Sequence, residues 1–96
     1  MMGKLQEMQQ KTEEVKKRLD TISVEAEAED GLVKVVSTAN RKITSITIQP
    51  SLMEEGDKEQ IEELTLLAVN RALEKAEKVA ETEMQGVAKG MLPGFM

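Results

Sequence analysis

The chain has 96 residues, with 18 acidic and 13 basic side chains and a formal net charge of −5, and it contains no histidine or cysteine. Without these two residue types there is no imidazole base, no thiol nucleophile and no zinc site of the usual kinds. Phe95 is the only aromatic residue, so the chain has no stacking platform for single-stranded nucleic acid. We therefore expect no enzyme activity, no bound metal and no cofactor.

The length predicts a single domain, residues 1–96, near the small end of the range that folds alone. A core built only from Leu, Ile, Val, Met and Ala is thin, which favours an oligomer. No apolar run approaches the roughly 18 residues of a membrane span, and the first residues lack the apolar region of a signal peptide. The lack of cysteine fits the cytoplasm. We expect a cytoplasmic protein with no membrane partner and no small-molecule substrate.

Residues 1–22 are predicted to form a helix with a heptad pattern. Its members recur at gaps of four and three residues: Met1, Leu5, Met8, Thr12, Val15, Leu19 and Ile22. Lys4, Lys11 and Arg18 lie seven residues apart along one flank of this pattern. Such a flank either pairs with acidic residues of a facing helix or faces the phosphates of DNA, and spacing leaves both interpretations open.

Residues 23–49 are predicted to form three antiparallel strands in meander order. From residue 22 to residue 29, small or apolar residues alternate with a serine and three glutamates, which gives the first strand one wet, acidic face. Asp30-Gly31 is the strongest two-residue hairpin signal in the chain. Leu32–Ser37 is therefore the expected return strand.

The third strand is predicted over Ile43–Ile48, where the phase of Ile43 against Ile46 and Ile48 indicates a bulge or an early turn residue. The turn before this strand, residues 40–42, is expected at the same end of the sheet as the end of the first helix. We therefore predict one basic patch there, made of Lys16, Lys17, Arg18, Arg41 and Lys42. This patch argues for an anionic partner, and the acidic first strand beside it argues against one.

After Pro50, which ends the third strand, residues 50–56 are expected to lead through a turn into one long helix over residues 57–91. Asp57 is a suitable N-cap, with Gln60 at the capping-box position. In the first half of this helix apolar residues cover more than half of the circumference, which indicates burial against a sheet and a partner subunit. The dimer-interface candidates are Leu64, Leu67, Ala68, Asn70 and Ala72. The second half carries one apolar stripe, so it projects or packs on another chain, and residues 92–96 form a tail.

Several segments resemble a single known family. They are Gly31–Val35 after the acidic strand, Ile46–Leu52 before an acidic turn, and Gly90–Phe95 at the end of the chain. The long helix adds four matching residues: Leu64, Ala68, Asn70 and Ala72. In their order and spacing these segments resemble the YbaB/EbfC family of small bacterial nucleoid-associated proteins, over nearly the whole chain.

The resemblance implies an α+β fold with a helix, a three-stranded antiparallel meander sheet and a long C-terminal helix. It also implies an intertwined homodimer whose helical arms project like tweezers and bind double-stranded DNA in the nucleoid, with modest sequence preference at most. Carried over to this sequence, it places six cations at the DNA: Lys4, Lys11 and Arg18 of the first helix, and Lys75, Lys78 and Lys89 of the second.

Two functions are consistent with these features. The first is a homodimeric, nucleoid-associated protein that coats or bridges duplex DNA through its phosphates and so organises the nucleoid or regulates genes. The second is an acidic dimeric interaction module whose arms bind a partner helix, for example in replication or recombination. The net charge of −5 favours the second, as does a methionine stripe of Met1, Met8, Met84 and Met91, which arm-to-arm packing also explains.

Overall fold

The structure of the chain, a computed structural model, describes residues 2–91, with side chains for residues 7 and 9–86. Met1 and the tail predicted at residues 92–96 lie outside the described residues. The elements follow in the order α1 (Met2–Leu19), β1 (Ser23–Ala28), β2 (Val33–Thr38), β3 (Ile43–Ile48), α2 (Pro50–Glu55) and α3 (Lys58–Met91). The strands form one antiparallel sheet in the order β1-β2-β3. The predicted α+β fold, with its meander sheet and long C-terminal helix, is confirmed.

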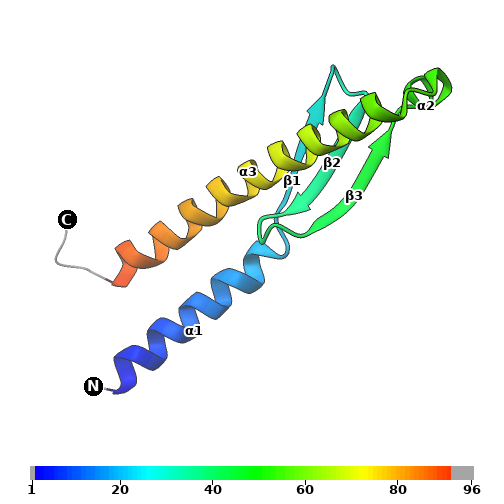
Figure 1. The fold of residues 1–96 in the computed structure, drawn as a ribbon. Coiled ribbons are helices and arrows are strands. Elements are labelled where there is room, and N and C mark those ends of the chain that lie inside the picture. The colour runs from blue at the N-terminus through cyan, green and yellow to red at the C-terminus, as the bar shows by residue number, and fades with distance from the viewer. Residues whose placement is uncertain (1, 92–96) are drawn as a thin grey trace.

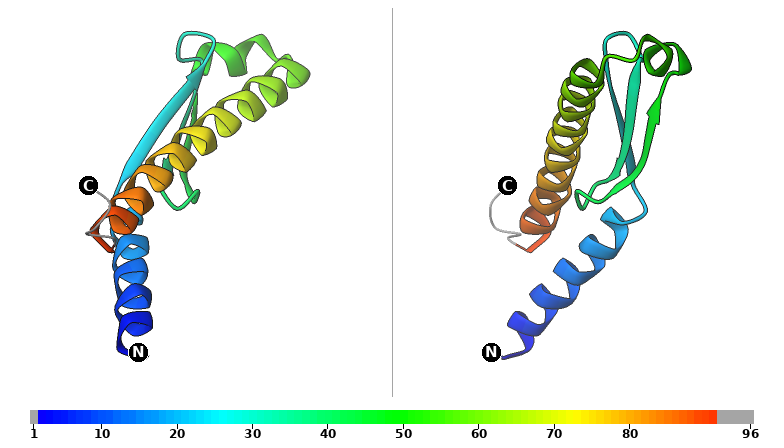
Figure 2. Two further views of the ribbon diagram at one scale, coloured as in Figure 1. Left: turned by 90° about the vertical axis from the view of Figure 1, so that its left-hand side faces the viewer. Right: turned by 45° about the vertical axis from the view of Figure 1, so that its right-hand side comes forward.

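The helix α3 lies across one face of the sheet and continues beyond it, and α1 leaves the sheet at that same end (Figure 1). The molecule is elongated as a result, with extents of 62 × 23 × 17 Å. Figure 2 shows α1 and the second half of α3 as two rods that extend past the sheet. α3 packs on β1 and β2, and it also contacts α1.

The core lies between α3 and the β1–β2 part of the sheet. It consists of Ala26, Ala28, Val33, Val35, Leu52, Leu64, Ala68 and Ala72. The buried face of α3 continues through Ala76, so three fully buried alanines follow one another at four-residue spacing. Because alanine is small, the helix backbone lies close to the sheet along this stripe. The stripe thereby determines which face of α3 points inward.

The β2–β3 ladder contains the irregularity predicted at Ile43. Val36 pairs with Ser45 and Ser37 pairs with Ile43, so Thr44 is the extra residue of a β-bulge. Without the bulge, Ile43 would point to the opposite face from the other isoleucines of β3. With it, all three isoleucines of this strand lie on the face that α3 covers in part.

The β1–β2 turn has the backbone that the Asp30-Gly31 signal predicts. Both residues have positive φ, 53° and 91°, and the Leu32 N–H donates to the Glu29 carbonyl at 3.2 Å. Glu29 also has positive φ, and the ladder begins at the Ala28–Val33 pair. Leu32 therefore belongs to the turn and not, as predicted, to the return strand.

The first helix is shorter than predicted, because α1 ends at Leu19 and not at residue 22. The Thr21 N–H donates to the Arg18 carbonyl at 2.9 Å, and the Ile22 N–H donates to the Leu19 carbonyl at 3.2 Å. These tight turns close the helix and start β1. Of the heptad pattern, Leu19 is buried, while Val15 is half-buried.

A short helix, α2, occupies the segment where a turn was predicted. Pro50 fits its first turn, where a missing N–H breaks no helical hydrogen bond, and Gly56 ends it with φ of 70°. Leu52 is buried and anchors α2 to the core. Asp57 then begins α3: its Oδ1 accepts the Gln60 N–H at 3.2 Å, which confirms the predicted N-cap.

Candidate nucleic-acid interface

The end of α1 and the β2–β3 turn are joined by specific hydrogen bonds. The Asn40 side-chain amide donates to the Lys16 carbonyl at 2.7 Å and to Oδ1 of Asp20 at 2.7 Å. The Ala39 N–H donates to the carbonyls of Leu19 and Ile22. These donors add to the backbone bonds at the last carbonyls of α1 and hold the β2–β3 turn against the helix end.

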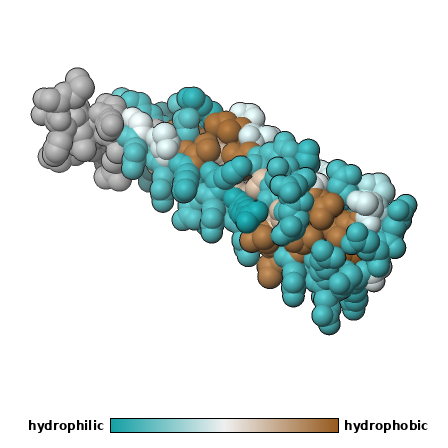
Figure 3. Space-filling view, turned by 90° about the horizontal axis from the view of Figure 1, so that it is seen from above, coloured by the Kyte–Doolittle hydropathy of each residue, from teal (hydrophilic) through white to brown (hydrophobic). Residues whose placement is uncertain are grey.

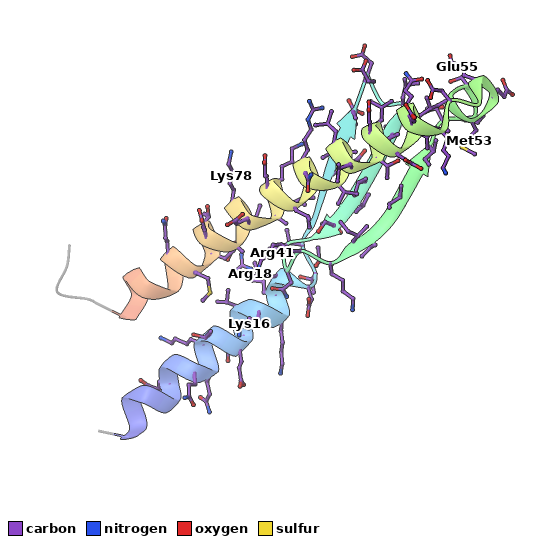
Figure 4. All side chains as sticks on the ribbon, in the orientation of Figure 1. Lys16, Arg18, Arg41, Met53, Glu55 and Lys78 are labelled. Carbon is purple, nitrogen blue, oxygen red and sulfur yellow. The ribbon has the colours of Figure 1, made fainter. Side chains whose placement is uncertain are left out.

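This joint brings together the five cations that the sequence predicted to form one patch. We call them the basic junction: Lys16, Lys17, Arg18, Arg41 and Lys42. All five are exposed. Figure 4 shows Lys16, Arg18 and Arg41 close to one another where α1 meets the sheet. Within the turn, Arg41 has φ of 64°, and its N–H donates to the Thr38 carbonyl at 3.0 Å.

Two acids, Asp20 and Glu83, make contacts at the basic junction. Asp20 is engaged by Asn40, and Glu83 of α3 pairs with Arg18 at 3.5 Å. Five cations against these two carboxylates, and against Glu13 and Glu14 one turn earlier on α1, leave the junction net positive on a chain that is acidic overall. Exposed cations held by the backbone of a helix end and a tight turn are suited to phosphate oxygens.

The end of the molecule formed by the hairpin tip and α2 is acidic. The hairpin tip carries Glu29 and Asp30, and α2 with the start of α3 carries Glu54, Glu55, Asp57 and Glu59. In Figure 4, Glu55 and Met53 lie at the far end of the molecule from Lys16, Arg18 and Arg41. The acidic residues of this end and the cations of the basic junction therefore lie apart along the molecule, and a polyanion is attracted to the junction.

The remaining predicted DNA-binding cations are distributed over different surfaces. Lys11 is exposed on α1, and Lys78 is exposed on α3, where it points away from α1 (Figure 4). Lys75 instead donates to the Glu25 carbonyl of β1 at 2.8 Å. Lys4 and Lys89 lie in α1 and α3, but their side chains are outside the described ones.

Arg71 of α3 contacts β1 in the same way as Lys75, a role that the sequence did not indicate. Its Nη1 donates to the Glu27 carbonyl at 3.0 Å, one turn of α3 before Lys75 reaches Glu25. Both side chains therefore satisfy carbonyls at the free edge of β1. The only sequence signal was the four-residue spacing of Arg71 and Lys75 on a helix that is acidic overall.

The predicted dimer-interface residues fall into two groups. Leu64, Ala68 and Ala72 are buried by the chain's own sheet. Leu67 and Asn70 are exposed. Only the second group offers side chains to another molecule, because the first is already part of the subunit core.

The described residues contain no group of three or more acidic side chains arranged to hold a metal ion. None of the described helices is both long and apolar enough to cross a membrane.

Comparison with known proteins gives concordant results. The model of the YbaB/EbfC DNA-binding family matches residues 1–91. A nucleoid-associated protein of Flavobacterium johnsoniae is 50% identical over 95 residues, covering 99% of this chain and 88% of that protein. A nucleoid-associated protein of Beijerinckia indica is 40% identical, covering 95% of this chain and 93% of that protein.

A solved structure shares the fold. The crystal structure of an uncharacterized protein from Helicobacter pylori superimposes with a TM-score of 0.73 at 22% identity, over 94% of this chain and 90% of that one. At that identity the likeness concerns the fold alone. The family match and the identities over nearly full length lead to one conclusion: the chain belongs to the YbaB/EbfC family of nucleoid-associated DNA-binding proteins.

Proposed function

We propose that this protein binds double-stranded DNA as a homodimer, through phosphates and with little sequence specificity, and so contributes to nucleoid organisation or gene regulation. The observation that carries the proposal is the basic junction, a net positive surface on a protein of charge −5. Family membership and the names of the relatives support the choice of DNA as the polyanion and of the nucleoid, in the cytoplasm, as the location.

The chemistry of the junction supports phosphate binding over base reading. Lysine and arginine side chains that neutralise phosphates release counterions, which makes the affinity steeply dependent on salt. Sequence reading needs an element in a groove that presents hydrogen-bonding side chains to base edges. The junction is a joint between a helix end and a turn, and its five members are all cations. Contacts of that kind position a protein on DNA without selecting a sequence.

The exposed apolar side chains support the homodimer. Ile46, Met53, Leu66, Leu67 and Met84 are large, apolar and exposed. Figure 3 shows brown, hydrophobic groups among the teal surface on one face of the molecule. For a chain with a core of small residues, a second subunit supplies the missing burial.

The test is a titration of a labelled duplex of about 40 base pairs at about 50 mM and about 200 mM salt, followed by anisotropy with light scattering in parallel. The wild-type protein should bind at the lower salt and lose affinity steeply at the higher, with the mass of a dimer. The double variant Arg41→Gln/Lys42→Gln should lower the slope of log affinity against log salt by about 1.8, or 0.9 for each lost phosphate contact.

The matched control is Lys34→Gln/Lys58→Gln. It removes the same charge from the outer sheet face and from the start of α3, where these lysines pair with Glu25 and Glu62. If both double variants weaken binding equally, net charge and not the junction determines the affinity. A wild-type dimer that fails to bind at the lower salt would contradict the DNA proposal itself.

A protein-binding module remains the second candidate, favoured by exposed Met53 and Met84 on an acidic chain. Exposed methionines adapt to varied apolar partners. This function predicts the opposite titration result: no DNA binding at low salt, together with retention of one protein, for example from replication or recombination, on the immobilised dimer. The side chains of Met1, Met8 and Met91, also part of the predicted stripe, lie outside the described ones.

A further inference from the structure

Arg41, in the β2–β3 turn, has a backbone conformation that arginine rarely adopts. Its φ is 64°. In this left-handed region the Cβ of an L-residue lies too close to the following carbonyl oxygen. Glycine, which has no Cβ, takes the same conformation without strain. An arginine at this position therefore lowers the stability of the turn.

The surrounding turn is well fixed. The Arg41 N–H donates to the Thr38 carbonyl at 3.0 Å, and the Thr38 N–H donates to the Lys42 carbonyl at 2.8 Å. Ala39 is fully buried, and the side chain of Asn40 is bound to the end of α1. The residues on both sides of Arg41 are thus held in place, and they impose its positive φ.

The side chain of Arg41 makes no contact that offsets this strain within the described part of the subunit. It is exposed, and the ion pairs found among the described side chains involve other cations. The hydrogen bond that Arg41 donates in the turn comes from its backbone. In Figure 4 its side chain lies at the basic junction, close to Arg18. The stability of the subunit therefore does not explain why an arginine stands here.

Strain by itself does not identify a site, because Glu29 in the β1–β2 turn also has positive φ, 50°. Arg41 differs in its place in the basic junction and in its available guanidinium. The other arginine of the junction, Arg18, is paired with Glu83 at 3.5 Å. A guanidinium can bind two phosphate oxygens at once, whereas the ammonium of a lysine acts as a point charge.

We infer that Arg41 is the principal phosphate-binding residue of the basic junction, and that its side chain occupies a position suited to glycine because of this contact. The inference rests on the DNA binding of the proposed function and specifies the residue that contributes most to it. Backbone strain that the surrounding structure imposes is typical of ligand-binding positions. Because the turn is fixed, little backbone freedom is lost when the guanidinium binds. Three lysines, Lys16, Lys17 and Lys42, add point charges around it.

The first experiment compares four variants that each remove one positive charge from the junction: Arg41→Gln, Lys16→Gln, Lys17→Gln and Lys42→Gln. Binding to the labelled duplex is followed by anisotropy at about 50 mM salt. Arg41→Gln should lower the affinity about tenfold, and each lysine variant should lower it less. Arg41→Lys keeps the charge and should keep the salt dependence, but it should lose affinity severalfold because the planar fork is gone.

The second experiment measures stability and binding in the same variant. Arg41→Gly removes both the strain and the side chain, so its midpoint in urea should rise while its affinity for DNA falls as in Arg41→Gln. Glu29→Gly is the matched control, since it relieves the same kind of strain in the acidic turn. Its midpoint should also rise, without any loss of DNA binding.

Two results would overturn the inference and leave the DNA proposal standing. The first is a wild type that binds while Lys42→Gln loses as much affinity as Arg41→Gln, because charge alone would then explain the junction. The second is an Arg41→Gly midpoint that does not rise, since the arginine would then not strain the turn. A wild-type dimer that fails to bind the duplex would overturn the DNA proposal and this inference together.

Discussion

Nη2 of Arg18 lies 3.5 Å from Oε1 of Glu83, so an ion pair joins the last turn of α1 to the second half of α3. Arg18 is largely exposed, whereas Glu83 is partly buried. An exposed pair of this kind contributes about 0–1 kcal/mol to stability. Its larger consequence concerns binding, because the carboxylate occupies a guanidinium that would otherwise contact a phosphate.

Substituting Glu83 should therefore strengthen DNA binding. Glu83→Gln frees Arg18, and we expect it to raise the affinity for duplex DNA severalfold at low salt. Glu81→Gln is the control, since it removes the same charge from an exposed position two residues away. Anisotropy titrations of both variants provide the comparison. Equal gains would attribute the effect to net charge and not to the Arg18 contact.

Asn40 should be necessary for the stability of the basic junction. Asn40→Ala removes two hydrogen bonds that join the β2–β3 turn to α1, which predicts a loss of about 1–2 kcal/mol in the free energy of unfolding. Asn40→Asp should cost at least as much, because the new carboxylate cannot donate to the Lys16 carbonyl and repels Asp20. Urea unfolding measures both variants. Wild-type stability of Asn40→Asp would contradict the assigned contacts.

Lys75 and Lys78 should have different roles although they lie one turn apart. Lys75→Gln removes the contact with the Glu25 carbonyl and is expected to lower the free energy of unfolding by about 1 kcal/mol. Lys78 is exposed, so Lys78→Gln should change stability by less than about 0.5 kcal/mol. Both variants change the net charge equally. Indistinguishable midpoints in urea would mean that Lys75 does not stabilise the β1 edge.

The alanine stripe of α3 should be intolerant of larger side chains. Ala72 is fully buried against the sheet, so Ala72→Leu forces the helix outward and should cost about 1–3 kcal/mol. Ala80 is only half-buried, and Ala80→Leu should be accommodated with little loss. Thermal unfolding of the two variants tests the difference. A stable Ala72→Leu variant would show that α3 can move away from the sheet at small cost.

Local structure in this chain was largely predictable from the sequence. Alternation in the strands, the Asp30-Gly31 turn, the phase change at Ile43 and the Asp57 cap depend on a few neighbouring residues. The errors were also local. Pro50 was expected only to end the third strand, but it also begins the helix α2. The burial of Leu52 in the core, which holds α2 in place, depends on the tertiary structure.

The composition of the basic junction was predictable for a topological reason. A helix followed by a meander returns the second turn to the helix end, which brings residues 16–18 and 41–42 together. The hydrogen bonds of Asn40 and the Arg18–Glu83 pair were not predictable, because they depend on how the side chains meet.

The sequence by itself determined the two long helices, the three strands, their order and the family. The tertiary structure decided the short helix α2 and which face of α3 packs on the sheet. Periodicity specifies the angles between residues around a helix, but when apolar residues cover more than half of it, several rotations bury a similar area. Packing on β1 and β2 selected the face of Leu64, Ala68 and Ala72 for the core. That rotation turned Lys75 toward the β1 edge and left Leu66 exposed, because a rigid helix moves all of its side chains together.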